Sequence, residues 1–420
     1  MQDVDKKLLK KNLLSEGYSV KVYPLDFVWV AAMGVMFTLS MELFYRMAVN
    51  FNDKYPSDLY YYAVQNPRTH DEKGRFIGEL FELLYSINEE VFESVVFLAF
   101  LMVGIIIANF LVIYYFVLDD GYQKKVPRHA MQFFSVAAIF MGTLYVPVIF
   151  ERYYMHTFKA FAWHSPTQLA MMFFALLGSI CFLKMYQGYE NRKVRFGWWI
   201  GAAVLIFFST WSKPGFTINM VFAVVLMFIV DLIRGNKKTI GQRFVKLFII
   251  GCSLIPSGLY ILWLHNASFT EGTQYGEEHA VLIDFAHVLE YDNLLGAIIF
   301  GCAIPIVVYA FNVKRFKDKK YKFALYVFAM GMVQWALFTE TGKRGNYGNF
   351  TWGRTYGIYF LTLTAAVVFI EVLFDKKGKY AKDKGKRMAF LIISGIVIAW
   401  AILSQLNYFR LVFTGHGYQL

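Results

Sequence analysis

Residues 197 to 233 read GWWIGAAVLIFFSTWSKPGFTINMVFAVVLMFIVDLI, an apolar run about twice as long as the roughly 20 residues that cross a bilayer. Basic segments flank this run on both sides, NRKVR before it and RGNKK after it. Because cytoplasmic loops of membrane proteins collect lysine and arginine, both flanks are expected on the same side. Proline and glycine stop helices, so SKPG at residues 212 to 215 predicts two short helices joined by a break.

The whole chain has the composition of an integral membrane protein. It is 420 residues long, 57% hydrophobic and only 17% charged, with 43 phenylalanines. A net charge of +12 would also suit a nucleic-acid partner, but the basic residues lie in short loops between apolar runs. The charge therefore indicates a membrane lipid surface and excludes a nucleic-acid patch.

Eleven apolar segments are candidate membrane spans. They cover approximately residues 26 to 47, 92 to 118, 129 to 149, 165 to 185, 197 to 211, 216 to 233, 247 to 264, 294 to 312, 323 to 339, 354 to 375 and 388 to 405. Helices are expected because they satisfy every backbone polar group within the segment. The prediction is an all-α polytopic membrane protein with about 11 transmembrane helices, in a single domain of residues 1–420.

The gaps between these spans fall into two alternating sets. One set contains KKLLKK, QKKVPR, NRKVR, RGNKK, KRFKDKKYK and KKGKYAKDKGKR, and holds about two thirds of the 42 lysines and arginines. The positive-inside rule places this set in the cytoplasm together with the N-terminal tail, residues 1–25, and leaves the C-terminus outside. If residues 197 to 233 formed one span without the break at SKPG, every later loop would move to the other side of the membrane. The lysine-rich loops would then lie outside, contrary to the positive-inside rule.

The other set then forms the outer loops, at residues 48–91, 150–164, 265–293 and 340–353. These loops are long and poor in basic residues, so the functional site of the protein is expected on the outer face. In the first of them, RFIGELFELLYSINEEVFESVV repeats apolar residues at helical spacing. This pattern predicts an amphipathic helix that lies along the outer membrane interface.

The first outer loop also contains NDKYPSDLYYY, residues 52 to 62, with two acids among tyrosines. Asp58 follows Pro56 and Ser57 just after the first span, and is therefore expected near the bilayer surface. A carboxylate at this position either caps a helix or acts as a general base.

Two further segments offer cations for an anionic ligand. In FTETGKRGNYGNFTWGR, residues 338 to 354, glycines alternate with Lys343, Arg344 and Arg354, which suits close approach of backbone and guanidinium groups to a phosphate. An ordinary basic hairpin loop is the alternative. Lys213, inside an apolar stretch, is a functional candidate by default, and snorkelling of its side chain to the surface is the alternative.

Metal ligands are sparse in the sequence. No HxxxH, HExxH or CxxC pair occurs, so a zinc site made by the protein is not predicted. A magnesium or manganese ion held by Asp58 together with a substrate phosphate is compatible with the sequence.

These features together resemble the GT-C superfamily of membrane glycosyltransferases that use polyprenyl-phosphate-sugar donors. The shared features are an acid just after the first span, about eleven helices and no soluble nucleotide-binding domain. YPSDLYYY resembles the loop that carries the catalytic acid, and WHSPTQLAMMFFALL and SKPGF are similar to segments of bacterial membrane proteins of this kind. Many members carry paired acids, whereas Asp58 stands between Ser57 and Leu59, so Asp53 is an alternative.

The resemblance implies sugar transfer from a polyprenyl-phosphate-linked donor to a hydroxyl acceptor, either a glycan, a lipid or a cell-wall polymer. The transfer would occur with inversion at the outer face of a bacterial plasma membrane, with Asp58 as base. The donor-phosphate cations would be Arg344, Lys343, Arg354 and Lys213. The substrate-binding residues would be Tyr55, Tyr60, Arg152, His164, Glu340 and Trp352, although aromatic belts at membrane interfaces also explain the aromatic ones.

Three other functions are alternatives. An O-antigen or capsule polysaccharide polymerase would act on a lipid-diphosphate-linked oligosaccharide and depend on outer-loop arginines rather than on a first-loop acid. In a polysaccharide-lipid transporter or flippase, SKPG would be the break of a discontinuous helix. Transporters of that kind usually show paired breaks and inverted repeats, and the sequence shows only one clear break. A non-catalytic membrane scaffold is the third alternative.

Overall fold

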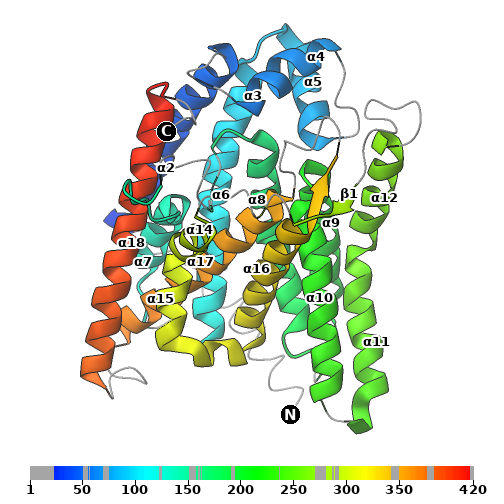
Figure 1. The fold of residues 1–420 in the computed structure, drawn as a ribbon, viewed down its shortest axis with the longest axis vertical. Helices are drawn as coiled ribbons and strands as arrows, with labels where there is room; N and C mark the ends of the chain where they lie inside the picture. The colour runs from blue at the N-terminus through cyan, green and yellow to red at the C-terminus, as the bar shows by residue number, and fades with distance from the viewer. Residues whose placement is uncertain are drawn as a thin grey trace, which may run out of the picture.

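The computed structural model describes most of the chain. The described residues are 23–50, 55, 57–69, 75–122, 125–150, 158, 161, 163–190, 194–235, 237–269, 281–285, 288, 293–341, 350–375 and 383–416. Within them the regular secondary structure is helical except for two three-residue strands, and the buried apolar side chains form one connected core. Figure 1 shows most of the long helices running side by side along the long axis of the molecule.

Seven described helices are long and apolar enough to cross a membrane. They are α2 (Pro24–Val49), α6 (Phe92–Asp119), α8 (Pro166–Tyr186), α10 (Gly215–Arg234), the continuous pair α11 (Ile240–Gly251) and α12 (Ile255–Phe269), α17 (Thr351–Phe374) and α18 (Lys384–Phe413). An eighth candidate is bent by 63° between α14 (Leu294–Gly301) and α15 (Ala303–Asn312). The all-α polytopic membrane architecture is confirmed, whereas the predicted total of about eleven spans is not.

The segment predicted to span the membrane at residues 129 to 149 is not a full helix. α7 (Arg128–Ala137) continues only through a 3-10 turn to Phe140, and residues 141 to 150 are not helical. Gly142 and Pro147 explain the early end, because glycine has a high conformational cost in a helix and proline removes a hydrogen bond. Residues 141 to 144 and Phe150 are buried, whereas residues 147 to 149 are exposed, so only part of this irregular backbone is packed inside the protein, the setting in which irregular backbone is tolerated.

Two further predicted spans are present as helices outside the group of seven. α9 (Phe196–Ser212) has only 17 residues, and α16 (Lys319–Leu337) begins with the sequence KKYK. α9 is shorter than the seven candidate spans, and α16 is more polar than they are.

Several described helix ends that flank the basic loops meet at one end of the molecule. Ion pairs join helix ends there: Lys125 lies 3.0 Å from Asp375, Arg315 lies 2.8 Å from Asp120, and Lys319 contacts both Glu190 and Asp231. We call this the basic end, defined by Asp119, Asp120, Lys125, Glu190, Asp231, Arg315, Lys319, Lys320, Glu371 and Asp375. The alternation of basic and outer loops and the cytoplasmic location of this end both stay predictions.

The break in the opening stretch is also present. α9 ends at Ser212, Lys213 has an extended backbone (φ −163°, ψ 120°), and α10 starts at Gly215 after Pro214. Glu190, before α9, and Asp231, near the end of α10, both contact Lys319, so the two helices form a hairpin that returns to the basic end. The hairpin turns at the opposite end.

The opposite end contains the remaining short elements. The short helices α3 (Asp58–Tyr60), α4 (Asn66–Thr69) and α5 (Phe76–Asn88) lie there, at the same end of the molecule as the C-terminal end of α18 (Figure 1). β1 (Val281–Ile283) pairs antiparallel with β2 (Phe338–Glu340). The helix α5 is thus present where an amphipathic helix was predicted. Its residues Ile77 and Phe81 are buried, and Ile87 is exposed. Its position along a membrane interface stays a prediction.

Candidate active site at the helix break

Lys213 is the central cation of the site, and its side chain is fixed by three neighbours. Its Nζ atom lies 3.3 Å from Thr167 Oγ1 and 3.5 Å from Ser165 Oγ, both at the start of α8. On another side, the same ammonium lies 3.7 Å from the centroid of the Trp352 ring, in the first turn of α17. The break between α9 and α10 therefore positions a half-buried ammonium against two other helix ends.

The break itself is held by polar contacts and by close backbone packing. Thr210 and Thr217 share a hydrogen bond of 2.7 Å across it. A Cβ atom on Gly215 would lie 3.0 Å from the backbone nitrogen of Gly353, which is tighter than most Cβ contacts, so glycine favours the close approach of α10 to the start of α17. This close approach places Lys213 next to Trp352.

Asp58 is the first residue of α3, and Ser57 is the residue that caps this helix. The Ser57 hydroxyl accepts a hydrogen bond from the Leu59 backbone N–H (3.0 Å) and donates one to the His164 carbonyl oxygen (2.9 Å). The alternative that Asp58 itself caps the helix is therefore wrong, because serine occupies the preceding N-cap position. The carboxylate of Asp58 is left for another role.

The electrostatic surroundings of Asp58 connect it to Lys213. Burial raises the pKa of the Asp58 carboxyl, while the charge of Lys213 and a hydrogen bond with Ser165 lower it. By its accessible surface, however, the Asp58 residue as a whole is exposed to solvent. The carboxyl is thus surrounded by protein and can still be reached, which is the combination needed by a group that reacts with a bound molecule.

His164 lies on the same side of the site. Its ring is 6.1 Å from the Trp352 ring, and its backbone carbonyl oxygen accepts the Ser57 hydrogen bond. The structure thus brings together Asp58, His164, Lys213 and Trp352, which the sequence analysis named from four distant segments.

Arg354 lies elsewhere on α17. Successive helix residues are rotated by about 100°, so Arg354 projects about 200° away from Trp352. Its guanidinium carbon is 3.9 Å from the Phe158 ring centroid and 4.6 Å from that of Trp335. The residue is only 4% exposed, and within the described part of the chain its Nε and Nη1 atoms have no hydrogen-bond acceptor. A buried cation with two unsatisfied nitrogen atoms is costly, which makes Arg354 a candidate for binding an anion.

Three of the other predicted substrate residues, Tyr55, Tyr60 and Glu340, lie in the described part of the chain. Glu340 is in β2, paired with Val281. The Tyr55 hydroxyl lies 3.4 Å from the Phe413 carbonyl oxygen at the end of α18, and Tyr60 is half-buried in α3. Asp53, Arg152, Lys343 and Arg344 lie outside the described residues.

Sequence reasoning missed three residues of the site, Ser57, Ser165 and Thr167. Ser57 caps α3, and the other two hydroxyls contact Lys213. A signal was present, because Ser165-Pro166 has the serine and proline order typical of a helix start. Hydroxyl groups at a helix start can contact a cation directly, and the backbone N–H groups beside them favour an anion.

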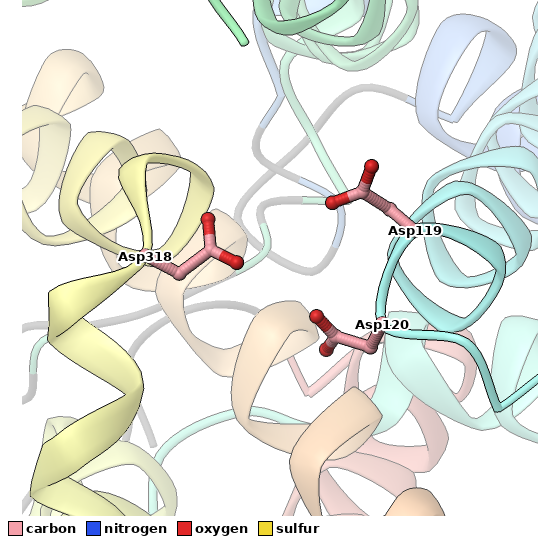
Figure 2. Close-up of side chains that lie close together, drawn as sticks. All are labelled: Asp119, Asp120 and Asp318. Carbon is pink, nitrogen blue, oxygen red and sulfur yellow. The ribbon is translucent and has the colours of Figure 1, made fainter. Parts of the chain in front are cut away.

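A cluster of three acids lies at the basic end, far from Asp58. Asp119 and Asp120 at the end of α6 face Asp318, the N-cap of α16, with their oxygen atoms within 4.8 Å of one another (Figure 2). The ammonium of Lys320 lies 2.9 Å from Asp119 and 2.6 Å from Asp120, so the position of a metal ion is already taken by a cation. Among the described residues, Asp58 belongs to no group of three metal-ligand side chains. A magnesium or manganese ion at Asp58 would depend on ligands from the substrate.

No protein-family model matches the chain, and no curated protein matches it in sequence.

Proposed function

We propose that the protein is an integral membrane glycosyltransferase. It transfers a sugar from a polyprenyl-phosphate-linked donor to a hydroxyl group of a glycan, lipid or cell-wall polymer, at the outer face of a bacterial plasma membrane. The observation that carries the proposal is the convergence of Asp58, Lys213 and Trp352 at the end opposite the basic loops. A carboxylate, a cation and an aromatic face are the groups that this reaction needs.

Asp58 is the general base of the proposed reaction. As the acceptor oxygen attacks the anomeric carbon, its proton moves to the Asp58 carboxylate, and the bond from that carbon to the phosphate oxygen breaks with its electron pair going to the phosphate. A carboxyl group whose pKa is raised is a stronger base than an ordinary aspartate. Attack from the face opposite the phosphate inverts the anomeric carbon.

Lys213 stabilises the leaving lipid phosphate. Negative charge grows on the phosphate in the transition state, and a cation already fixed in place needs no reorganisation to stabilise it. The Ser165 and Thr167 hydroxyls and the Trp352 ring hold the ammonium in position. The Trp352 ring also offers an apolar face on which a sugar ring can stack.

Arg354 is a second anion-binding residue in this proposal. It lies on the other side of the first turn of α17 from Trp352, so Lys213 is the cation beside the carboxylate. The phosphate-binding roles of Lys343 and Arg344 in the glycine-rich loop are predictions that come from the sequence alone.

The membrane arrangement is part of the proposal. α9 and α16, which fall outside the seven long spans, each lead from the basic end toward the opposite end, as crossing segments would. A cytoplasmic N-terminus and an outer C-terminus agree with basic residues gathering at one end.

A polysaccharide-lipid transporter or flippase is the second candidate, because a second helix break exists. α14 and α15 are bent by 63° around Cys302, in addition to the break at Lys213. Paired discontinuous helices are a feature of many transporters. A polymerase is the third candidate, since the buried Arg354 lacks acceptors for two of its nitrogen atoms among the described residues.

The test is sugar transfer by the purified protein in vesicles. The donors are polyprenyl-phosphate hexoses with a radiolabelled sugar, and the readout is label in an acceptor fraction of cell-envelope glycans. Asp58→Asn should lower the rate by at least about 100-fold, because a general base contributes about that much or more. Glu90→Gln is the control, since Glu90 is an exposed carboxylate just before α6.

Three outcomes separate the candidates. Loss of transfer in Asp58→Asn with normal rates in Glu90→Gln supports the proposal. Equal rates in the wild type and both variants would remove Asp58 from the reaction. Movement of labelled lipid across the vesicle membrane without any sugar transfer would favour the transporter.

A further inference from the structure

A cavity of about 310 Å³ lies at the basic end, far from Asp58. It is formed by the end of α15, the 3-10 turn Val313–Lys317, the end of α17 and the start of α18. Its size is at the lower limit of small-ligand sites in proteins, large enough for a lipid headgroup and too small for an oligosaccharide.

The cavity has a strong excess of positive charge. Lys314, Arg315, Lys386 and Arg387 line it, and Asp383 is the one acidic residue among its described lining residues. Asp383 is the N-cap of α18, and its Oδ1 atom accepts a hydrogen bond of 2.9 Å from the Lys386 backbone N–H. The acid is therefore engaged with the helix, and the cavity remains electropositive.

The two arginines form the framework of the cavity. Arg387 donates to the carbonyl oxygens of Val372 (3.1 Å) and Leu373 (2.9 Å), which connects the start of α18 to the end of α17. Arg315 pairs with Asp120 and Glu371. Both guanidinium groups are thus fixed in place with or without a ligand.

The two lysines are different. Lys314 and Lys386 are exposed, and neither forms an ion pair with another described residue. Their ammonium groups stand at the rim of a preformed cavity and are the charges left for an external anion. An anion there also benefits from the positive end of the α18 dipole.

Apolar surface continues from the cavity along α15. Ala310 and Val313 line the cavity and are exposed, and Ile306, one turn before Ala310, is 47% exposed. A row with this spacing runs along one face of the helix. A charged cavity at the end of a membrane helix, followed by an exposed apolar face, matches a molecule with an anionic head and acyl chains.

We propose that this cavity binds the phosphate-bearing headgroup of an anionic phospholipid, with the acyl chains lying along α15. The phosphate is held by Lys314 and Lys386 at the rim, above the fixed arginines. Basic pockets between helices at a membrane surface bind anionic lipid headgroups for the same electrostatic reason.

The experiment measures lipid binding to the purified full chain in neutral detergent by native mass spectrometry. Phosphatidylglycerol is the anionic probe, and phosphatidylcholine is the zwitterionic reference. The test variant is Lys314→Gln with Lys386→Gln. The control variant is Lys317→Gln with Lys384→Gln, which removes the same charge from exposed positions of the same two elements that do not line the cavity.

The test variant should lose about 25-fold in phosphatidylglycerol affinity, because each basic residue near an anionic surface contributes about fivefold. The control variant should lose much less. Equal losses in the two variants would overturn the proposal, since they would show a general charge effect. No preference for phosphatidylglycerol over phosphatidylcholine would overturn it as well.

Inorganic phosphate separates a lipid site from a free-anion site. Competition by phosphate only at concentrations far above those of the lipid supports a site that also uses the acyl chains. Competition at equal concentrations would overturn the lipid assignment. Melting temperatures of both variants should match the wild type, because the substituted lysines are exposed.

Discussion

The ammonium of Lys213 lies 3.7 Å from the ring centroid of Trp352, although the two residues are 139 positions apart. The ring covers one side of the cation, and hydroxyl groups of α8 approach it from another. A cation held in this way is pre-organised and stabilised by the aromatic quadrupole. The contact joins the break between α9 and α10 to the start of α17, and it forms one wall of the site that Asp58 faces.

Asp58→Asn should keep or slightly raise the melting temperature at pH 7. Burial raises the pKa of Asp58 in the folded protein, so the folded state prefers the protonated carboxyl. The resulting stabilisation is complete below the ordinary carboxyl pKa of about 3.9 and is lost as pH rises through the folded pKa. At pH 7 the wild type therefore holds an unfavourable charge that asparagine lacks.

Thermal unfolding in detergent from pH 4 to pH 8 checks this. The difference between Asp58→Asn and the wild type should grow as pH rises. A variant that melts well below the wild type at pH 7 would instead show that the carboxylate is a structural group.

Lys213→Met should shift the acidic limb of the rate profile to higher pH. The charge of Lys213 lowers the pKa of Asp58, so its removal raises that pKa further, and the base is then protonated over a wider range. The rate at high pH should also fall by about 100-fold or more, because the phosphate loses its cation. The measurement is kcat/KM against pH, and a limb that stays in place would separate Lys213 from Asp58.

Arg354→Met should bind the lipid-phosphate donor at least about tenfold more weakly, because a charged hydrogen-bond donor is lost, and should fold as well as the wild type. The guanidinium is buried between Phe158 and Trp335, and two of its nitrogen atoms lack acceptors among the described residues, so an apolar side chain of similar length fits the same space. Donor affinity and melting temperature are measured together. A large fall in melting temperature with unchanged affinity would assign Arg354 to the core.

Lys320→Ala should destabilise the protein by about 3–5 kcal/mol, as expected when one partner of a buried ion pair is removed. The Lys320 side chain is completely buried against Asp119 and Asp120, and its removal leaves their charges uncompensated. Added calcium should restore part of the melting temperature in this variant, because three acids then surround an empty cation position. Lys317→Ala, at an exposed lysine of the same end, is the control and should respond to neither change.

The sidedness of the membrane arrangement is testable with single cysteines. A membrane-impermeant maleimide applied to intact cells should label Glu90→Cys and leave Lys317→Cys unlabelled until the membrane is opened. The native Cys181, Cys252 and Cys302 are free thiols and are replaced by serine first. The reverse labelling pattern would place the Asp58 site in the cytoplasm and contradict the proposed function.

Local sequence signals were sufficient for much of the fold. Apolar composition over about 20 residues identified the long helices, and SKPG marked the break between α9 and α10. The lysine-rich loops indicated which helix ends meet at one end of the molecule. These features depend on a few neighbouring residues, so the sequence alone determines them.

The same signals failed where packing outweighs local preference. Apolar composition predicted a full span at residues 129 to 149, because a partly buried irregular segment is as apolar as a helix that faces lipid. The bend at Cys302 has Pro305 nearby but no glycine and proline pair like that at residues 214 and 215, so it was not predicted.

The membrane class, most of the helices and the list of candidate residues came from the sequence. Only the tertiary structure decided that Ser57 caps α3, that Asp58 shares a site with Lys213 and Trp352, and that Arg354 lies on the other side of α17. The reason is physical. Helix formation and membrane insertion depend on the composition of one segment, whereas the meeting of side chains depends on how several helices rotate and pack against one another.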